Sequence, residues 1–312
     1  MEHRQLGPSG LSVSLVGLGC NNFGGRLDVE GTRTVVDRAI ARGINLFDTA
    51  DVYGNRGGSE TCLGEVLGPR RKDIVLATKF AMPMSDDGSM RGASRRYVKQ
   101  ACEASLKRLR TDWIDLYQVH QYDDDTPIDE TMEALDDLVR DGKVRHVGCS
   151  NFSADQLDDA QEVATGNGWA PFVTCQDHYS LLAREIEAEL IPAIRRRKMG
   201  LLPFFPLASG FLTGKYTRNN PPPEGTRMAT MPRMADRYMT EHNWDVVDAL
   251  AAFAREHGRT LLELAFAWLA AQPTVSSVIA GATRPEQIDQ NVGAVGWQLS
   301  AGELATIDRI TG

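Results

Sequence analysis

The sequence lacks the cysteine pattern of a disulfide framework or a zinc site. Its 5 cysteines are odd in number, and no two of them stand at Cys-x-x-Cys spacing. They are Cys20, Cys62, Cys102, Cys149 and Cys175. Scattered cysteines of this kind are typical of free thiols in a reducing compartment. The His, Asp and Glu residues show no metal-ligand spacing either, so we expect no metal site.

Long apolar runs and a targeting signal are also missing. No run approaches the ~20 apolar residues that a membrane-spanning helix needs. Residues 1–5 are polar and carry no signal-peptide pattern. We therefore predict a cytoplasmic protein without a membrane partner.

Positive charge is scarce, with a formal net charge of -8 at pH 7. The one dense basic run, residues 195–198, lies at the end of a helical pattern, where cations suit the helix dipole. A nucleic-acid binder needs a basic face, so nucleic acid is not an expected partner.

The chain also lacks a dinucleotide-binding glycine motif after its first strand. Gly17-Leu18-Gly19 is followed by Cys20-Asn21-Asn22 and not by a third glycine. This disfavours a doubly wound open sheet, which is the second choice of fold.

Strand-like and helix-like segments alternate along the chain. The predicted strands are residues 15–19, 44–48, 74–79, 114–120, 144–149, 172–176, 200–204 and 277–280. Amphipathic helical patterns follow them, at 30–42, 59–67, 95–110, 129–141, from 153 onward, and at 184–197, 243–257, 260–272 and 285–292. About eight βα units predict an α/β protein with one closed (β/α)8 TIM barrel over residues 1–312. A short β-hairpin is expected at residues 2–14, and the proline-containing loop 206–241 is long enough to be a lid or binding loop.

Four ionisable residues lie at or just beyond the carboxyl ends of predicted strands: Asp48, Tyr53, Lys79 and His120. These ends meet at one rim of a barrel, so we expect the four side chains to form one site. A lone aspartate cap, half-buried tyrosine, surface lysine or core histidine is the alternative for each residue by itself. Together they form a proton donor for an oxygen that gains negative charge, with the lysine expected to lower the tyrosine pKa. Carbonyl reduction with hydride from a cofactor fits this set.

These residues resemble the active-site tetrad of the aldo-keto reductase superfamily. Asp48-Thr49-Ala50-x-x-Tyr53-Gly54 is followed in order by Lys79, His120, Gly148-Cys149-Ser150-Asn151 and Gln176. The segments 206–216 and 281–291 resemble the family's pyrophosphate loop and adenosine-phosphate segment. The resemblance implies NADPH-dependent reduction of a small aldehyde or ketone, with Tyr53 as the general acid. It implies these cofactor residues: Gly19, Cys20, Asn21, Asp48, Ser150, Asn151, Gln176, Phe204, Pro206, Leu207, Ser209, Gly210, Lys215, Gly281, Thr283, Arg284, Gln287 and Asn291.

Two segments differ from the family pattern or can be interpreted without it. Phe204 stands where a tyrosine or tryptophan is common, and Phe205 is bulkier than the usual serine. In the last segment Thr283 is expected to cap a helix that starts at Pro285. The helix N-terminus and the Arg284 guanidinium would then form a phosphate site. The alternative is an ordinary capped surface helix.

Two other functions stay open. One is a redox-sensing regulatory subunit that binds NADPH and turns over slowly, as in channel-associated members of the superfamily; the expected lack of an N-terminal extension before the barrel disfavours it. The other is a Schiff-base aldolase that uses Lys79, which the neighbouring Asp48 and Tyr53 fit poorly. The substrate and the oligomeric state are not predicted.

Overall fold

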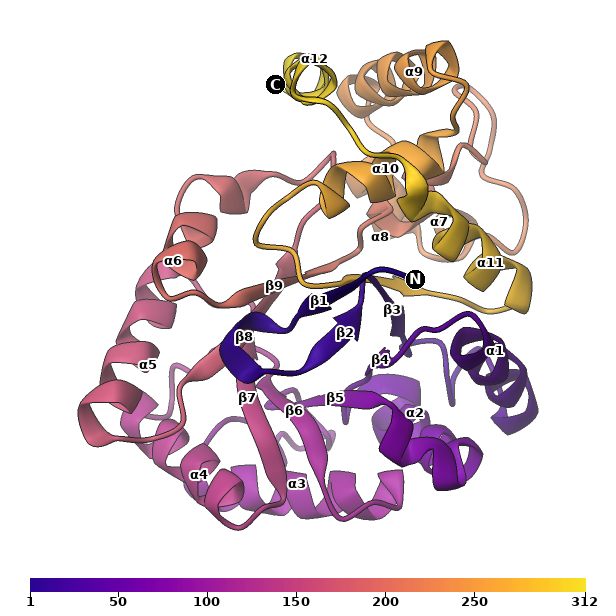
Figure 1. Cartoon of the computed structure of the whole chain (residues 1–312). Helices are drawn as coiled ribbons and strands as arrows, with labels where there is room; N and C mark the ends of the chain where they lie inside the picture. Colours follow the sequence, from indigo (N-terminus) through magenta and orange to yellow (C-terminus); the bar gives the residue numbers. More distant parts are fainter.

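The apolar runs of the sequence form eight parallel strands that surround a common axis (Figure 1). The computed structural model describes all residues from Met1 to Gly312. The strands are β3 (Val16–Gly19), β4 (Leu46–Asp48), β5 (Val75–Phe80), β6 (Ile114–Val119), β7 (Val144–Ser150), β8 (Phe172–His178), β9 (Gly200–Phe204) and β10 (Val278–Gly281). Their order is β10-β3-β4-β5-β6-β7-β8-β9, and a parallel bridge between Leu201 and Val275 closes the ring. The predicted (β/α)8 barrel is confirmed.

Helices pack around the outside of the barrel (Figure 1). They are α1 (Val29–Ala41), α2 (Tyr53–Leu67), α3 (Arg95–Leu109), α4 (Ile128–Arg140), α5 (Ala154–Asn167), α6 (Leu190–Arg196), α7 (Arg227–Thr230), α8 (Pro232–Tyr238), α9 (Glu241–Glu256), α10 (Leu261–Ala270), α11 (Pro285–Gly293) and α12 (Ala301–Thr311). No helix combines the length and the apolar character that crossing a membrane would require.

Two helix predictions need correction. The helix expected at 184–197 begins only at Leu190, because Pro192 has no backbone N–H and is tolerated only in the first turn of a helix. A short 3-10 turn, Glu185–Glu187, precedes it. Helix α12 was not predicted, although the sequence carries its start signal. Ser300 and Glu303 form a reciprocal capping box at its N-terminus.

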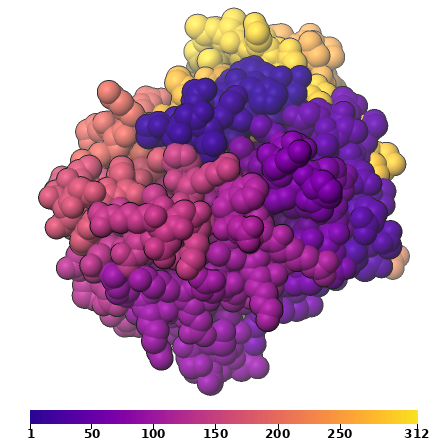
Figure 2. Space-filling model, turned by 60° about the horizontal axis from the view of Figure 1, so that its bottom comes forward, coloured from indigo at the N-terminus to yellow at the C-terminus, as the bar shows by residue number.

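The predicted N-terminal hairpin is present. Strands β1 (His3–Gln5) and β2 (Ser12–Ser14) pair antiparallel, with a 3-10 turn between them. Gly7 has a φ of 53°, and a Cβ there would lie 2.1 Å from the Val173 carbonyl oxygen. The turn thus lies directly against the starts of β8 and β9. In Figure 2 the N-terminal residues, in indigo, lie at the surface between the C-terminal residues in yellow and the magenta middle segment.

The alternation of side chains along each strand separates two cores. Nine buried residues, among them Leu6, Leu46, Ala77 and Leu116, form a cluster inside the barrel that the hairpin covers. The larger cluster, which includes Phe47 and Leu76, packs between the strands and the helices. Since successive strand residues point to opposite faces, the residues two places after Leu46, Ala77 and Leu116 also face inward. The interior is thus apolar at the hairpin end and polar at the other.

Candidate active site

The inward positions at the carboxyl ends of β4, β5 and β6 carry polar side chains. Asp48 is the last residue of β4, Lys79 the penultimate residue of β5, and Gln118 lies two residues after Leu116 in β6. His120 follows the end of β6, and Tyr53 starts α2. The structure therefore brings the four predicted catalytic residues to one rim of the barrel.

Lys79 is completely buried, with an exposed fraction of 0%. Its Nζ donates to Asp48 Oδ2 at 2.7 Å and to the Thr49 carbonyl oxygen at 2.8 Å. Burial lowers the pKa of Lys79, but the Asp48 carboxylate and, to a smaller extent, Tyr53 outweigh it. The net pKa lies above the ordinary lysine value, so the amine is a fixed cation at neutral pH.

The second oxygen of Asp48 is held by two amides. Gln176 Nε2 donates to Asp48 Oδ1 at 2.9 Å, and Gln118 Nε2 lies 3.4 Å from the same oxygen. Gln118 was not predicted as a site residue. Its position two residues after the inward-facing Leu116 could have indicated that it also faces the barrel interior. The two amides fix the orientation of Asp48 and so the position of the Lys79 cation.

Tyr53 lies between Lys79 and His120. Lys79 Nζ is 5.1 Å from the centre of the Tyr53 ring, and the His120 ring meets Tyr53 edge-on with centroids 5.7 Å apart. Burial raises the pKa of Tyr53, and the nearby Lys79 cation lowers it by less. The expectation of a net lowered phenol pKa is therefore wrong for this structure, because the cost of burying a phenolate exceeds the attraction of Lys79. Tyr53 is consequently protonated at neutral pH, the form that a general acid requires.

His120 is a neutral imidazole at physiological pH. Burial, followed by repulsion from Lys79, lowers its pKa to about 3. Its Nδ1 is buried and has no hydrogen-bond partner within the protein. A buried nitrogen left without a partner is costly, which makes this ring available to a bound molecule.

The tetrad opens into a cleft with a volume of about 800 Å3. Tyr53 and His120 line it together with these predicted cofactor residues: Gly19, Cys20, Asn21, Asp48, Ser150, Asn151, Gln176, Phe204, Pro206, Leu207, Ser209, Gly210, Lys215, Gly281, Thr283, Arg284 and Gln287. Two predicted site residues do not line the cleft. Lys79 is buried beneath the cleft wall, and Asn291 is buried about two turns into α11. A volume of this size suits a cofactor and a small substrate.

The cleft is rich in cations although the whole chain is acidic. Arg26, Lys215, Arg227 and Arg284 line it, against the acidic Asp48 and Glu224. Asp48 is already paired with Lys79. Arg26 and Arg227 were missed by sequence reasoning, and Arg227 packs over the Phe205 ring with its guanidinium carbon 5.8 Å from the centroid. Burial lowers the pKa of Arg227, and Arg26 adds to this effect. This surplus of positive charge fits an anionic ligand such as a dinucleotide.

Comparison with known proteins shows the family of the chain. Residues 15–311 match the Aldo/keto reductase family. The chain belongs to this family. It is 38% identical over 305 residues to the uncharacterized oxidoreductase YrpG of Bacillus subtilis, covering 95% of this chain and 91% of that protein. It is 37% identical over 303 residues to a probable voltage-gated potassium channel subunit beta of Arabidopsis thaliana, with coverage of 95% and 91%. To the L-glyceraldehyde 3-phosphate reductase of Escherichia coli O157:H7 it is 33% identical over 322 residues, with coverage of 99% and 92%.

Membership of the aldo/keto reductases makes the chain an oxidoreductase of a family that uses nicotinamide cofactors and acts on small carbonyl compounds. The Schiff-base alternative fits poorly. An aldolase lysine must attack as a free amine, whereas Lys79 is a buried cation beneath the cleft.

The segment 281–291, for which an adenosine-phosphate site is predicted in this aldo/keto reductase, differs from its prediction in one detail. Thr283 does not cap α11; Arg284 is the N-cap residue and makes no side-chain cap bond. The Thr283 N–H and hydroxyl instead donate to Gln287 Oε1, at 2.7 and 3.1 Å. Pro285 at the first helical position leaves Arg284 in extended backbone, so the capping position falls one residue later than expected. The Arg284 side chain is 66% exposed and lies 3.9 Å from Glu286.

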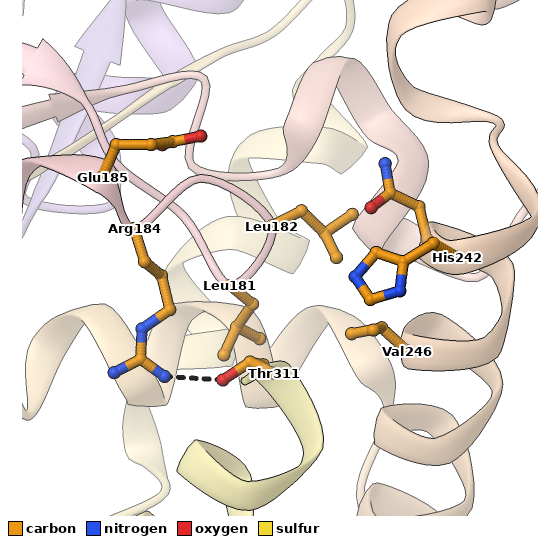
Figure 3. A pocket seen from close by; sticks show the side chains of 8 residues that line it. Leu181, Leu182, Arg184, Glu185, His242, Val246 and Thr311 are labelled. Atoms are coloured by element: carbon orange, nitrogen blue, oxygen red, sulfur yellow. Dashed lines mark hydrogen bonds between the residues drawn. The ribbon is translucent and has the colours of Figure 1, made fainter.

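A second, smaller pocket of about 210 Å3 lies near the C-terminus, between the segment after β8, the start of α9 and the end of α12 (Figure 3). Its one arginine, Arg184, donates to Thr311 Oγ1 and forms ion pairs with Glu187 and Asp308. Since these groups already neutralise the guanidinium, this pocket offers no free cation comparable to those of the main cleft.

Proposed function

We propose that this aldo/keto reductase reduces an aldehyde or ketone to an alcohol with NADPH, and that Tyr53 is the general acid. The observation that carries the proposal is the buried Lys79–Asp48 pair beside a protonated Tyr53 and a neutral His120, open to a cation-rich cleft. The substrate is a small carbonyl compound. The five cysteines are free thiols and suit a cytoplasmic location.

NADPH, when bound, supplies the hydride that reduces the carbonyl carbon. His120 donates a hydrogen bond to the carbonyl oxygen and so orients it. As negative charge develops on that oxygen, the Tyr53 phenol transfers its proton to it, and solvent later restores this proton. Lys79 stabilises the transient phenolate, and Asp48 keeps Lys79 in place.

The cleft residues have distinct proposed roles toward the cofactor. Ser150, Asn151 and Gln176 hold the nicotinamide carboxamide. Gln176 Nε2 is used by Asp48, which leaves its Oε1 to accept a hydrogen bond. Phe204 would offer its ring face to the nicotinamide ring. Lys215 and the backbone of residues 206–210 hold the diphosphate, and Arg284 with the N-terminus of α11 holds the 2′-phosphate.

The test is a panel of aldehydes and ketones followed by the loss of NADPH absorbance. We expect many turnovers per enzyme molecule with at least one carbonyl compound, and none with Tyr53→Phe. The proposal would be contradicted if natively folded enzyme binds NADPH but no compound of the panel leads to its oxidation.

A second candidate is a regulatory subunit that senses cofactor redox state. It is favoured by the 37% identity to a protein whose name states a potassium channel subunit. Such a protein would oxidise its bound NADPH once and then release the product cofactor slowly. Comparing the single-turnover rate with the steady-state rate on the same aldehyde separates the two functions.

A further inference from the structure

Three ionisable side chains, two of them buried and one partly exposed, lie together under the loop that carries Tyr53, and none of them lines the cleft. They are Asp51, Glu60 and Arg108. Glu60 is 0% exposed, and both of its oxygens are occupied. Glu60 Oε1 accepts from Thr78 Oγ1 at 2.6 Å, and Oε2 accepts from Arg108 Nε at 2.7 Å. The one guanidinium of the cluster is thus committed to Glu60.

Asp51 is buried in the same place without such support. It is 1% exposed, and neither carboxyl oxygen has a hydrogen-bond partner of normal geometry. Its backbone N–H donates to the Lys79 carbonyl oxygen at 3.0 Å, which ties it to the strand of the catalytic lysine. An ionised carboxylate without donors is expensive to bury, and the cluster holds two carboxyl groups against one cation. A proton on Asp51 balances the charge.

The cluster supports the Tyr53 loop at both ends and in the middle. Asp51 precedes Tyr53 by two residues, and Glu60 lies near the start of the regular part of α2. Between them, residues 54–57 all have φ values between 61° and 108°. A Cβ on Gly57 would lie 2.7 Å from Arg108 Cδ, so Arg108 packs directly on the loop. A change of charge in the cluster therefore acts on the segment that positions the phenol.

We propose that Asp51 is a positioning residue for Tyr53: its carboxyl group is protonated in the active enzyme, and its ionisation at alkaline pH displaces the Tyr53 loop. This rests on the proposed function only for its effect on turnover. The charge state of Asp51 and its effect on folding stability are independent of any reaction.

The surroundings of Asp51 agree with this assignment. Burial, and next the Glu60 carboxylate, raise the pKa of Asp51 to about 8, while Arg108, the Val52 N–H and Lys79 lower it by less. The titratable groups around it are Glu60 from α2, Lys79 from β5, Tyr97 and Arg108 from α3, and Tyr117 from β6. Both phenols are neutral near pH 8, because burial raises the pKa of Tyr97 to about 12 and that of Tyr117 above its usual range.

The direction of the pH effect follows from the raised pKa. The folded state keeps the Asp51 proton up to about pH 8, whereas the unfolded chain releases it near pH 3.8. The contribution of this group to folding stability is therefore complete below pH 3.8. It is lost progressively as the pH rises from 3.8 through the folded pKa of about 8. In that window the unfolding equilibrium constant rises by up to roughly tenfold per pH unit.

The experiment compares wild type with Asp51→Asn, a neutral residue of the same shape. Urea unfolding and kcat are measured from pH 6 to 9.5, and infrared spectroscopy follows the C=O band of a protonated carboxylic acid. We expect Asp51→Asn to keep kcat at pH 7 within a few-fold and to flatten the fall in stability toward pH 8. It should also move the alkaline decline of kcat from near pH 8 to at least one pH unit higher. The infrared band should vanish as wild type passes pH 8 and be missing from Asp51→Asn.

Two further variants sharpen the result. Glu60→Gln removes a negative charge and frees Arg108 for Asp51, so the alkaline decline of kcat should move to lower pH. Asp177→Asn is the matched control, because burial raises the pKa of Asp177 to about 6 at a position outside the cluster. In this variant the decline of kcat near pH 8 should remain.

If stability and kcat of Asp51→Asn depend on pH in the same way as in wild type, the proposal is overturned. A flattened stability profile with an unmoved kcat profile would overturn the positioning role. If no variant has activity, the proposed function fails, while stability and infrared data still decide the state of Asp51.

Discussion

Lys79 Nζ lies 2.7 Å from Asp48 Oδ2 in an almost fully buried ion pair, of which only Asp48 lines the cleft. Lys79→Met leaves the Asp48 carboxylate buried beside only neutral amides. We expect this change to lower the free energy of unfolding by about 3–5 kcal/mol and kcat by at least ~10²-fold. Asp48→Asn combined with Lys79→Met should recover much of the stability but none of the rate. Recovery of both would show that Lys79 is purely structural; urea unfolding and steady-state kinetics measure the two effects.

Tyr53→Phe should remove turnover while leaving NADPH affinity within a few-fold. The substitution deletes only the phenol hydroxyl, which acts on the developing alkoxide and not on the bound cofactor. The ring that meets His120 edge-on is retained, so the fold of the site should survive. Steady-state kinetics and fluorescence titration with NADPH provide the measurements. A variant that keeps most of its kcat would place the general acid elsewhere.

His120 should make the enzyme less stable in acid. The pKa of His120 in the folded protein is about 3, below the ordinary value of 6.5. At a pH between these two values, the imidazole is protonated in the unfolded chain and neutral in the folded protein. Stability from this difference is lost as pH falls from 6.5 toward 3, and over that range the unfolding constant rises by up to roughly tenfold per pH unit. His120→Asn should therefore lose less stability than wild type between pH 7 and 5 in urea unfolding. His242→Gln, at an exposed position, should behave like wild type; equal slopes for His120→Asn and wild type would contradict the assignment.

The positions of the proposed catalytic residues were predictable because they follow directly from the strand pattern. Once an apolar run is placed as a barrel strand, the polar residue at its carboxyl end must reach the common rim, as Asp48 and Lys79 do. The same alternation could have given Gln118. Local rules also explain the helix errors, since Pro192 delays α6 and the Ser300–Glu303 capping box announces α12.

Other features depend on long-range packing and could not be read from local patterns. Arg227 reaches the cleft because the segment after β9 folds back over the barrel, and no periodicity in that proline-containing segment encodes this path. The net effect on the Tyr53 pKa depends on how deeply the phenol is buried, which only the folded structure shows. The charge balance of Asp51 likewise requires knowing that Glu60 and Arg108 have already paired.

Cofactor choice should depend on Arg284. NADPH differs from NADH by one 2′-phosphate, and only a group beside that phosphate can discriminate between them. Arg284 lines the cleft at the N-terminus of α11, where backbone N–H groups favour an anion. Its side chain is 66% exposed and lies 3.9 Å from Glu286, so only a weak ion pair must be given up when a phosphate binds.

A charge-assisted contact of this kind contributes about 1.5–3 kcal/mol, which corresponds to roughly ten- to hundred-fold in affinity. We therefore expect wild type to prefer NADPH, and Arg284→Ala to weaken NADPH by about that factor with little change for NADH. Fluorescence titration at fixed salt measures both affinities, and Arg227→Ala supplies a matched loss of one cation from the same cleft. If the preference for NADPH survives in Arg284→Ala and disappears in Arg227→Ala, the 2′-phosphate lies beside Phe205 and the role assigned to α11 is wrong. If Arg284→Ala weakens both cofactors equally, Arg284 contacts a part that NADPH and NADH share.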